Sequence, residues 1–331
     1  LLGCGGGDGD GVENDSNGDP MSLLPGESNM MGYIDLAWIM DEMDIEGFYE
    51  SVPKEPGDPQ SFSEILDILG IEELEEAYMF GDMSDMTAST ELLETEAGYL
   101  GLIVVGQFNQ EQLIDALETQ AEGELVSDDY KGHTIYSDSS DEMALAFLSS
   151  ETLVLGTPES VEDVIDVKEG DRSPIKGEVV NTYNDLGSGM VKMAMVMPED
   201  AMEEMVQGGT EGFDMGLNLF SLFEDMETVG LVIDKSGDSL PIDARICFSN
   251  KESAENMKGM LALIIGMMDM EGMEMEEGDE AFFEVIEGMD VKLDGKCVKI
   301  GMEITSDIIE DMAESFEEGF MEGFEGFGFG G

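Results

Sequence analysis

Methionine is the residue type whose spacing most suggests chemistry in this sequence. The chain contains 28 methionines, and five of them crowd one short stretch: Met267, Met268, Met270, Met273 and Met275. Thioether sulfurs at Met-x-Met and Met-x-x-Met spacing are ligands for the soft cuprous ion. Methionine also fills irregular cores without any metal, and it is frequent elsewhere, as in residues 193–197. The stretch is a candidate copper site, with core packing as the alternative.

Two cysteines, Cys247 and Cys297, fall in segments that alternate like strands. The apolar residues of 242–248 share one face, and those of 298–304 do the same, which leaves both thiols on polar faces beside Arg245 and Lys299. The thiols can meet if the two strands are neighbours, and an oxidising exterior permits a disulfide. The spacing of the three cysteines in the chain matches no zinc site.

Motifs typical of catalysis are missing from the sequence. The single histidine, His133, is interpreted as a surface residue, and there is no Gly-x-Ser-x-Gly elbow, P-loop or His-Glu-x-x-His. Pairs of carboxylates are uninformative because 78 of the 331 residues are Asp or Glu. We predict a protein that is not an enzyme and has no cofactor.

The charge balance is the most unusual property of the composition. The 78 acids face only 13 Lys and Arg, which gives a formal charge of −65, and the acids are spread along the whole chain. Their mutual repulsion is screened only in brine, where the Debye length falls to roughly 3 Å at 1 M salt. The composition predicts a salt-adapted protein of a halophilic prokaryote, an archaeon in particular. Nucleic acid is not expected as a partner, since phosphate binding needs clustered Lys and Arg.

The chain opens with Leu1-Leu2-Gly3-Cys4. A leucine three positions before a cysteine, with a small residue directly before it, resembles the lipobox of prokaryotic lipoproteins, although Leu2 is an unusual occupant of its position. The resemblance implies cleavage before Cys4, a lipid on its thiol, and a protein tethered to the outer face of the cell membrane. Two lipid chains suffice for stable attachment.

Residues 1–29 hold this motif and a Gly/Asp/Asn-rich stretch without apolar periodicity, which is typical of a flexible tether. Asp8 and Asp10 sit at alternate positions, as in acidic calcium loops. Val12 occupies the third such position, so a tether is the preferred interpretation.

Periodicity predicts an α+β fold made of two similar units of mostly antiparallel sheet, with helices packed on one face. The first unit, 30–170, is predicted to hold strands at 32–40, 77–83, 99–108, 131–137, 143–148 and 152–156, with helices at 62–69, from Asn109 and after Thr157. A connector follows at 171–188. The second unit, 189–318, is predicted to hold strands at 190–197, 228–235, 242–248, 290–293 and 297–304, with helices at 198–206, from Asn250 and from Ser306.

The layout of the body is similar to that of surface lipoproteins of bacteria and archaea built from duplicated α+β units. In those proteins a Gly-x-Phe strand end and a Tyr-x-Gly-x-x-Ile-Tyr element recur, and they correspond here to residues 106–108 and 130–136. The second unit lacks the Tyr-Gly-Tyr element. The resemblance implies structural roles for these motifs and brings no activity with it.

Residues 319–331 form a Gly/Phe-rich tail, in which Phe320 and Phe324 continue a helical stripe from Phe316. We expect either a frayed end or a docking segment for a protein partner or a membrane. The function expected from the whole sequence is a non-enzymatic binding or structural module of the envelope. The alternatives are a carrier of an apolar ligand in a Met/Phe-lined cavity and an extracytoplasmic protein that binds copper or calcium.

The charge predicts that the fold depends on salt. Lowering the salt from about 1 M to about 0.01 M lengthens the Debye length from roughly 3 Å to roughly 30 Å, so repulsion among the carboxylates should unfold the chain. Circular dichroism during a salt titration measures this, with sucrose at matched osmolality as the control for preferential exclusion. An intact fold at about 0.01 M salt would contradict salt adaptation.

Overall fold

The structure is a computed structural model of the whole chain. It describes residues 19–42, 45–51, 54, 59–82, 84, 98–120, 125–137, 142–198, 225–237, 239–268, 285–286 and 288–305. Cys4, Met270, Met273, Met275 and the Phe-rich tail lie outside these residues.

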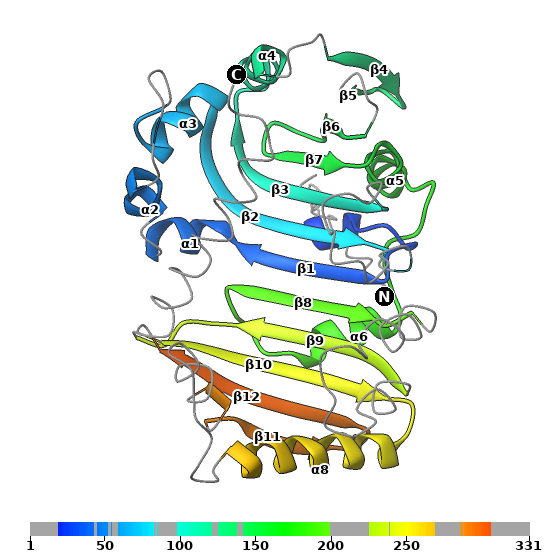
Figure 1. Cartoon of the computed structure of the whole chain (residues 1–331). Coiled ribbons are helices and arrows are strands. Elements are labelled where there is room, and N and C mark those ends of the chain that lie inside the picture. The colour runs from blue at the N-terminus through cyan, green and yellow to red at the C-terminus, as the bar shows by residue number, and fades with distance from the viewer. Residues whose placement is uncertain are drawn as a thin grey trace, which may run out of the picture.

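The described residues form the following strands and helices, of which the strands and α-helices are labelled in Figure 1. The strands are β1 (Met30–Asp35), β2 (Ile71–Gly81), β3 (Leu100–Phe108), β4 (Val126–Tyr130), β5 (His133–Ser137), β6 (Ala144–Phe147), β7 (Thr152–Gly156), β8 (Val191–Val196), β9 (Met226–Ile233), β10 (Ser239–Phe248), β11 (Asp290–Asp294) and β12 (Cys297–Thr305). The helices are η1 (Pro20–Leu23), α1 (Leu36–Glu42), α2 (Ile45–Ser51), α3 (Phe62–Leu69), α4 (Gln110–Gln120), α5 (Pro158–Glu169), α6 (Glu178–Asp185) and α8 (Lys251–Met268).

All twelve strands belong to one antiparallel sheet, in the order β11-β12-β10-β9-β8-β1-β2-β3-β7-β6-β5-β4 (Figure 1). The α+β class predicted from the sequence is confirmed. The first strands of the two predicted units, β1 and β8, pair with each other, so the units share a single continuous sheet. Outward from this pair the pairing order is the same on both sides: β1-β2-β3-β7 on one and β8-β9-β10-β12 on the other.

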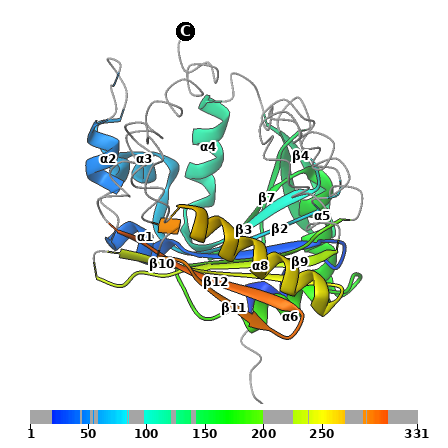
Figure 2. The same cartoon turned by 60° about the horizontal axis from the view of Figure 1, so that its bottom comes forward.

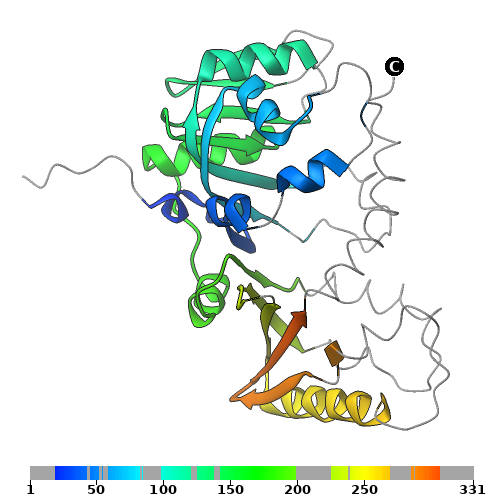
Figure 3. The same cartoon turned by 90° about the vertical axis from the view of Figure 1, so that its left-hand side faces the viewer.

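Helices flank both faces of the sheet, whereas the sequence predicted them on one. On β3 and β7, Ile103 and Val154 pack in the cluster that contains α5 and α6, while their neighbours Val104 and Leu153 pack in the cluster with α4. Adjacent strand residues point to opposite faces, so α4 lies opposite α5 and α6. Residues paired across neighbouring strands point to the same face. Following these pairs from β3 to β10 shows that α8 packs on the same face of the sheet as α4. Figure 3 shows α5 and α6 on one side of the sheet and α8 on the other.

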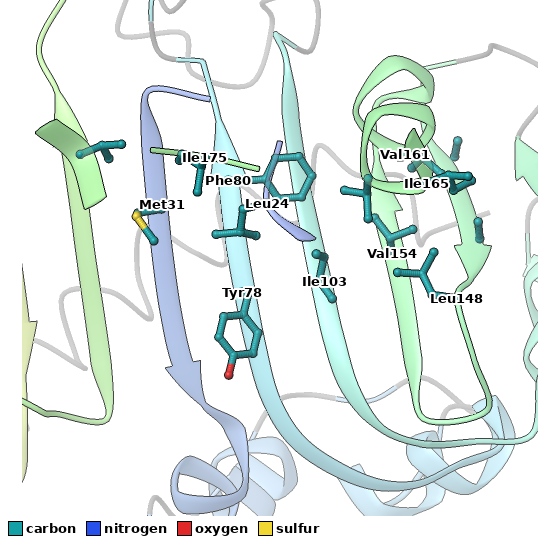
Figure 4. Packing of buried hydrophobic residues seen from close by; sticks show 14 of the residues in the cluster. Leu24, Met31, Tyr78, Phe80, Ile103, Leu148, Val154, Val161, Ile165 and Ile175 are labelled. Carbon is teal, nitrogen blue, oxygen red and sulfur yellow. The ribbon is translucent and has the colours of Figure 1, made fainter. Parts of the chain in front are cut away.

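The largest group of buried side chains fills the space between the sheet and α5, α6 and η1. Figure 4 shows its members, among which Leu24, Met31, Phe80, Ile103, Val154, Val161 and Ile165 are fully buried. A smaller cluster under α8 centres on Phe248, Met257 and Val298, and Figure 2 shows α8 lying across the strands at that end of the sheet. Tyr78 lies at the margin of the large cluster, with its hydroxyl pointing away from Leu24 and Phe80 (Figure 4).

Several predicted elements differ from those observed. The strand predicted at 32–40 ends at Asp35, because the Asp35 carboxylate accepts a hydrogen bond from the Trp38 amide at 2.9 Å and caps helix α1. Strand β2 begins at Ile71, six residues before the prediction, in a Glu-rich segment of low strand propensity. The connector at 171–188 contains helix α6, and β4 was not predicted.

Cys247 and Cys297 lie directly opposite each other on β10 and β12 and form a disulfide. The bond closes a loop with a sequence separation of 50 residues. The disulfide therefore links β10 to β12, which are separated in the chain by α8 and β11.

We predict that replacing both Cys247 and Cys297 with alanine lowers the free energy of unfolding by roughly 4 kcal/mol, the chain-entropy value for a loop of this size. Urea unfolding in high salt measures the change. A reducing agent should destabilise the native chain by a similar amount and leave the double variant unaffected. Equal unfolding midpoints with and without reductant in the native chain would contradict the prediction.

Candidate functional site

The most site-like feature of the described residues is a cavity of about 540 Å³ at the middle of the sheet, on the face covered by η1 and α6. Its aromatic and charged lining includes Tyr33, Trp38, Glu76, Tyr78, Tyr183 and Lys192. We call this cavity the tyrosine cup. It spans the β1–β8 pairing, where the two halves of the sheet meet.

Strand register sets the floor of the cup. Tyr33 on β1 lies opposite Lys192 on β8 and opposite Tyr78 on β2, so the three side chains form a row on one face of the sheet. In the next row on that face Asp35 lies opposite Glu76. Tyr183 reaches the cup from helix α6 and Met21 from η1.

Glu76 holds the two floor tyrosines together. The Tyr78 hydroxyl donates to one Glu76 carboxylate oxygen at 2.6 Å, and the Tyr33 hydroxyl lies 3.4 Å from the other. The two rings are 5.4 Å apart between centroids, with a tilt of 60°. Burial and the charge of Glu76 raise the pKa of Tyr33 to about 12 and also raise the pKa of Tyr78. Both phenols therefore remain protonated donors at any physiological pH.

Lys192 is stacked on an aromatic ring. Its ammonium lies 4.0 Å from the centroid of Tyr183, within the range of a cation–π contact. Burial lowers the pKa of Lys192. Within the part of the chain that the structure describes, no carboxylate forms an ion pair with this ammonium. Most other cations of the chain do have such a partner, among them Lys131, Arg172 and Arg245.

Trp38, the only tryptophan of the chain, stands at the rim. Helix α1 begins directly after Asp35, and this places the indole beside the cup. The ammonium of Lys235 lies 5.3 Å from the centroid of the Trp38 ring. The cup therefore carries a built-in fluorescent reporter.

The cup is equipped for binding. It offers aromatic faces, an ammonium and the carboxylates of Asp35, Glu76 and Asp234 in one open cavity. Such a mixture of rings and a few polar groups fixes the orientation of a small organic ligand. Among the described residues, no group of three or more His, Cys, Asp or Glu side chains is placed to hold a metal ion.

The sequence-predicted site residues lie elsewhere. Cys247 and Cys297 form the disulfide described above, and His133 lies 3.3 Å from Glu169 at a partly exposed position. Met267 and Met268 close helix α8, where only the backbone is described. The remaining methionines of that stretch, Cys4 and the tail fall outside the described residues, and the copper and anchor predictions remain predictions.

The Tyr-x-Gly-x-x-Ile-Tyr element attaches the β4–β5 hairpin to helix α5. Lys131 and Gly132 have positive φ values of 53° and 85° and make the two-residue turn between β4 and β5. The Tyr130 hydroxyl donates to Asp166 on α5 at 2.9 Å, and the Lys131 ammonium lies 2.7 Å from the same carboxylate. The element thus clamps the edge hairpin onto helix α5.

The tyrosine cup is not predicted by the sequence. Its residues come from segments that are far apart in the chain, and only the alternation of Tyr33 and Asp35 in a predicted strand hinted at a shared face. The register of β1 against β2 and β8, which unites them, is set by tertiary pairing.

No family model matches this chain, and no curated protein matches it in sequence. Among solved structures it is similar to TP0453, crystal form III, with a TM-score of 0.52 and 8% identity over 91% of this chain and 99% of that one. Crystal forms I and IV of TP0453 give TM-scores of 0.48 and 0.49 at 9% identity. At this identity the likeness shows a shared fold, which spans both halves of the sheet. Among the described residues, no helix is long and apolar enough to cross a membrane.

Proposed function

We propose that this chain is a membrane-tethered extracytoplasmic lipoprotein of a salt-adapted prokaryote, and that its body is a non-enzymatic binding module. The observation that carries the binding role is the tyrosine cup, a preformed cavity that combines four aromatic rings with an ammonium and carboxylates. The proposed extracytoplasmic location rests on the Leu1–Cys4 motif, and the proposed salt adaptation rests on the net charge of −65.

The two halves of the body are proposed to descend from one duplicated unit, with the boundaries predicted above. The equal pairing order of β1-β2-β3-β7 and β8-β9-β10-β12 supports this proposal. The cup then occupies the interface between the two copies, the position at which binding sites often form.

The lining of the cup favours a polar ligand over the apolar one considered from the sequence. Tyrosine hydroxyls, three carboxylates and an ammonium surround the cavity, and its methionines, Met21 and Met190, are a minority of the lining. An apolar ligand would displace water from the Lys192 ammonium and the Tyr183 hydroxyl without replacing its hydrogen bonds, at a cost of about 1–3 kcal/mol for each group.

The tether can be tested in cells that express the full-length gene product. Cys4→Ser removes the thiol that carries the lipid, so the variant is expected to leave the membrane fraction and appear in the medium. Ser16→Ala, which changes the predicted tether and leaves the lipid site and the disulfide intact, is the matched control. A Cys4→Ser protein that still fractionates with membranes would rule out this anchor.

Binding can be tested through the fluorescence of Trp38. We expect a saturable change with at least one member of a panel that covers four chemical classes: glucose, tetramethylammonium, acetate and glycine betaine. Glu76→Gln should weaken the response, because it removes the charge that faces Tyr33 and Tyr78. Glu72→Gln, an exposed change on the same strand, should leave it unchanged. A folded protein that responds to none of the four would refute the binding role.

A further inference from the structure

The charge of Lys192 is left unmatched within the part of the chain that the structure describes. The chain has 78 carboxylates for 13 Lys and Arg, and exposed lysines such as Lys251 and Lys296 find carboxylate partners. Lys192 is half-buried, lines a cavity and stacks on the ring of Tyr183, and it forms no ion pair with a described carboxylate. An ammonium that lines a cavity without an ion pair is positioned to receive an anionic group from outside the chain.

Tyr183 supplies a second donor beside Lys192. Among the described residues its hydroxyl has no hydrogen-bond partner, although the residue is only 6% exposed and lines the cup. Burial raises the pKa of Tyr183, so the hydroxyl keeps its proton. An ammonium and a neutral hydroxyl together form a receptor for a carboxylate.

The other side of the cup has the opposite character. Glu76 accepts from Tyr78 and lies near the Tyr33 hydroxyl, and Asp35 lies opposite it in the strand register. The faces of the two rings carry negative electrostatic potential, and with the neighbouring carboxylates they suit an organic ammonium.

The strand register fixes the backbone spacing of the two sides. Tyr33 stands between Lys192 on β8 and Tyr78 on β2, and neighbouring strands are about 4.8 Å apart. Lys192 and Tyr78 are therefore two strand spacings apart at the backbone, while the Tyr183 hydroxyl lies within range of the charges of Glu76 and Asp19, so the two groups of side chains converge on the open cavity. A small ligand that carries both an ammonium and a carboxylate meets both groups where they converge.

We propose that the tyrosine cup binds a small organic zwitterion, whose carboxylate is held by Lys192 and Tyr183 and whose ammonium lies against Tyr33, Tyr78 and Glu76. The proposal rests on the binding role proposed above and names the class of ligand. The negative side of the cup selects the cationic end, and the ring-stacked ammonium selects the anionic end.

The first test compares the whole ligand with its halves on the folded protein in high salt, by Trp38 fluorescence and calorimetry. Glycine betaine should bind at least about tenfold more tightly than tetramethylammonium or acetate, because each half lacks one charged contact. Equal or tighter binding of either half would overturn the zwitterion and leave the binding role standing. Absence of binding by all panel members, glucose included, would overturn both.

The second test changes Lys192. Lys192→Met keeps the aliphatic stem on Tyr183 and removes the charge, so it should lower the affinity for glycine betaine about tenfold and abolish its advantage over tetramethylammonium. Lys192→Arg should preserve that advantage. Lys251→Met makes the same charge change on helix α8 and should have no effect. Should Lys192→Met fail to fold, the Lys192→Arg variant and the comparison on the native chain still decide.

A third test distinguishes a ligand with a methylated ammonium from one with a primary ammonium. If glycine betaine binds more tightly than β-alanine, the methylated ammonium is held mainly by the ring faces. If β-alanine binds more tightly, hydrogen bonds from a primary ammonium to Glu76 and Asp35 dominate. Both results support the zwitterion. If neither glycine betaine nor β-alanine binds, the proposal is contradicted.

Discussion

The antiparallel pairing of β1 with β8 is the interaction on which the rest of the structure depends. It joins five strands on one side to seven on the other, and without it the chain would have two smaller sheets with two more exposed edges. The same pairing sets Tyr33 beside Lys192 and so creates the row of side chains that floors the tyrosine cup. Architecture and candidate site therefore share one register, and a slip of one residue would turn the whole row to the opposite face.

Scarcity of positive charge is the second constraint. All 13 Lys and Arg lie in the described residues, and several of them fasten elements together. Arg172 lies 2.5 Å from the buried Asp163 of α5, which also accepts from the Tyr99 hydroxyl, and it lies 3.2 Å from Glu27 near the start of the chain. Arg245 pairs with Asp185 on α6 and with Asp294 on β11. Lys192 differs from these paired cations, because it stacks on a ring inside a cavity.

The sequence predicted the class of fold well because strand alternation and helix caps are local. The hairpin at Asp294-Gly295, the helix after Thr157 and the strands of the meander follow from such signals. Failures occurred where a neighbour decides the structure. Glu-rich residues 71–76 become a strand because β3 pairs with them, and α6 forms where Val179 and Tyr183 can bury against β1 and β8. The cup was invisible for the same reason, since its residues meet only through non-local register.

The proposed salt adaptation and the proposed ligand chemistry are linked by the range of electrostatic forces. In brine the Debye length is roughly 3 Å at 1 M, so the net charge of −65 cannot attract or repel a ligand over any distance. Discrimination must then come from direct contacts, made where water and ions are displaced. Aromatic rings displace water and ions in this way. A cation that lies against an aromatic face is shielded from competing ions, and nearby carboxylates still attract it. Lys192 on Tyr183, and Glu76 behind two phenols, are charges presented in this shielded form. A small zwitterion that meets both at once keeps its two short contacts when every longer attraction is screened.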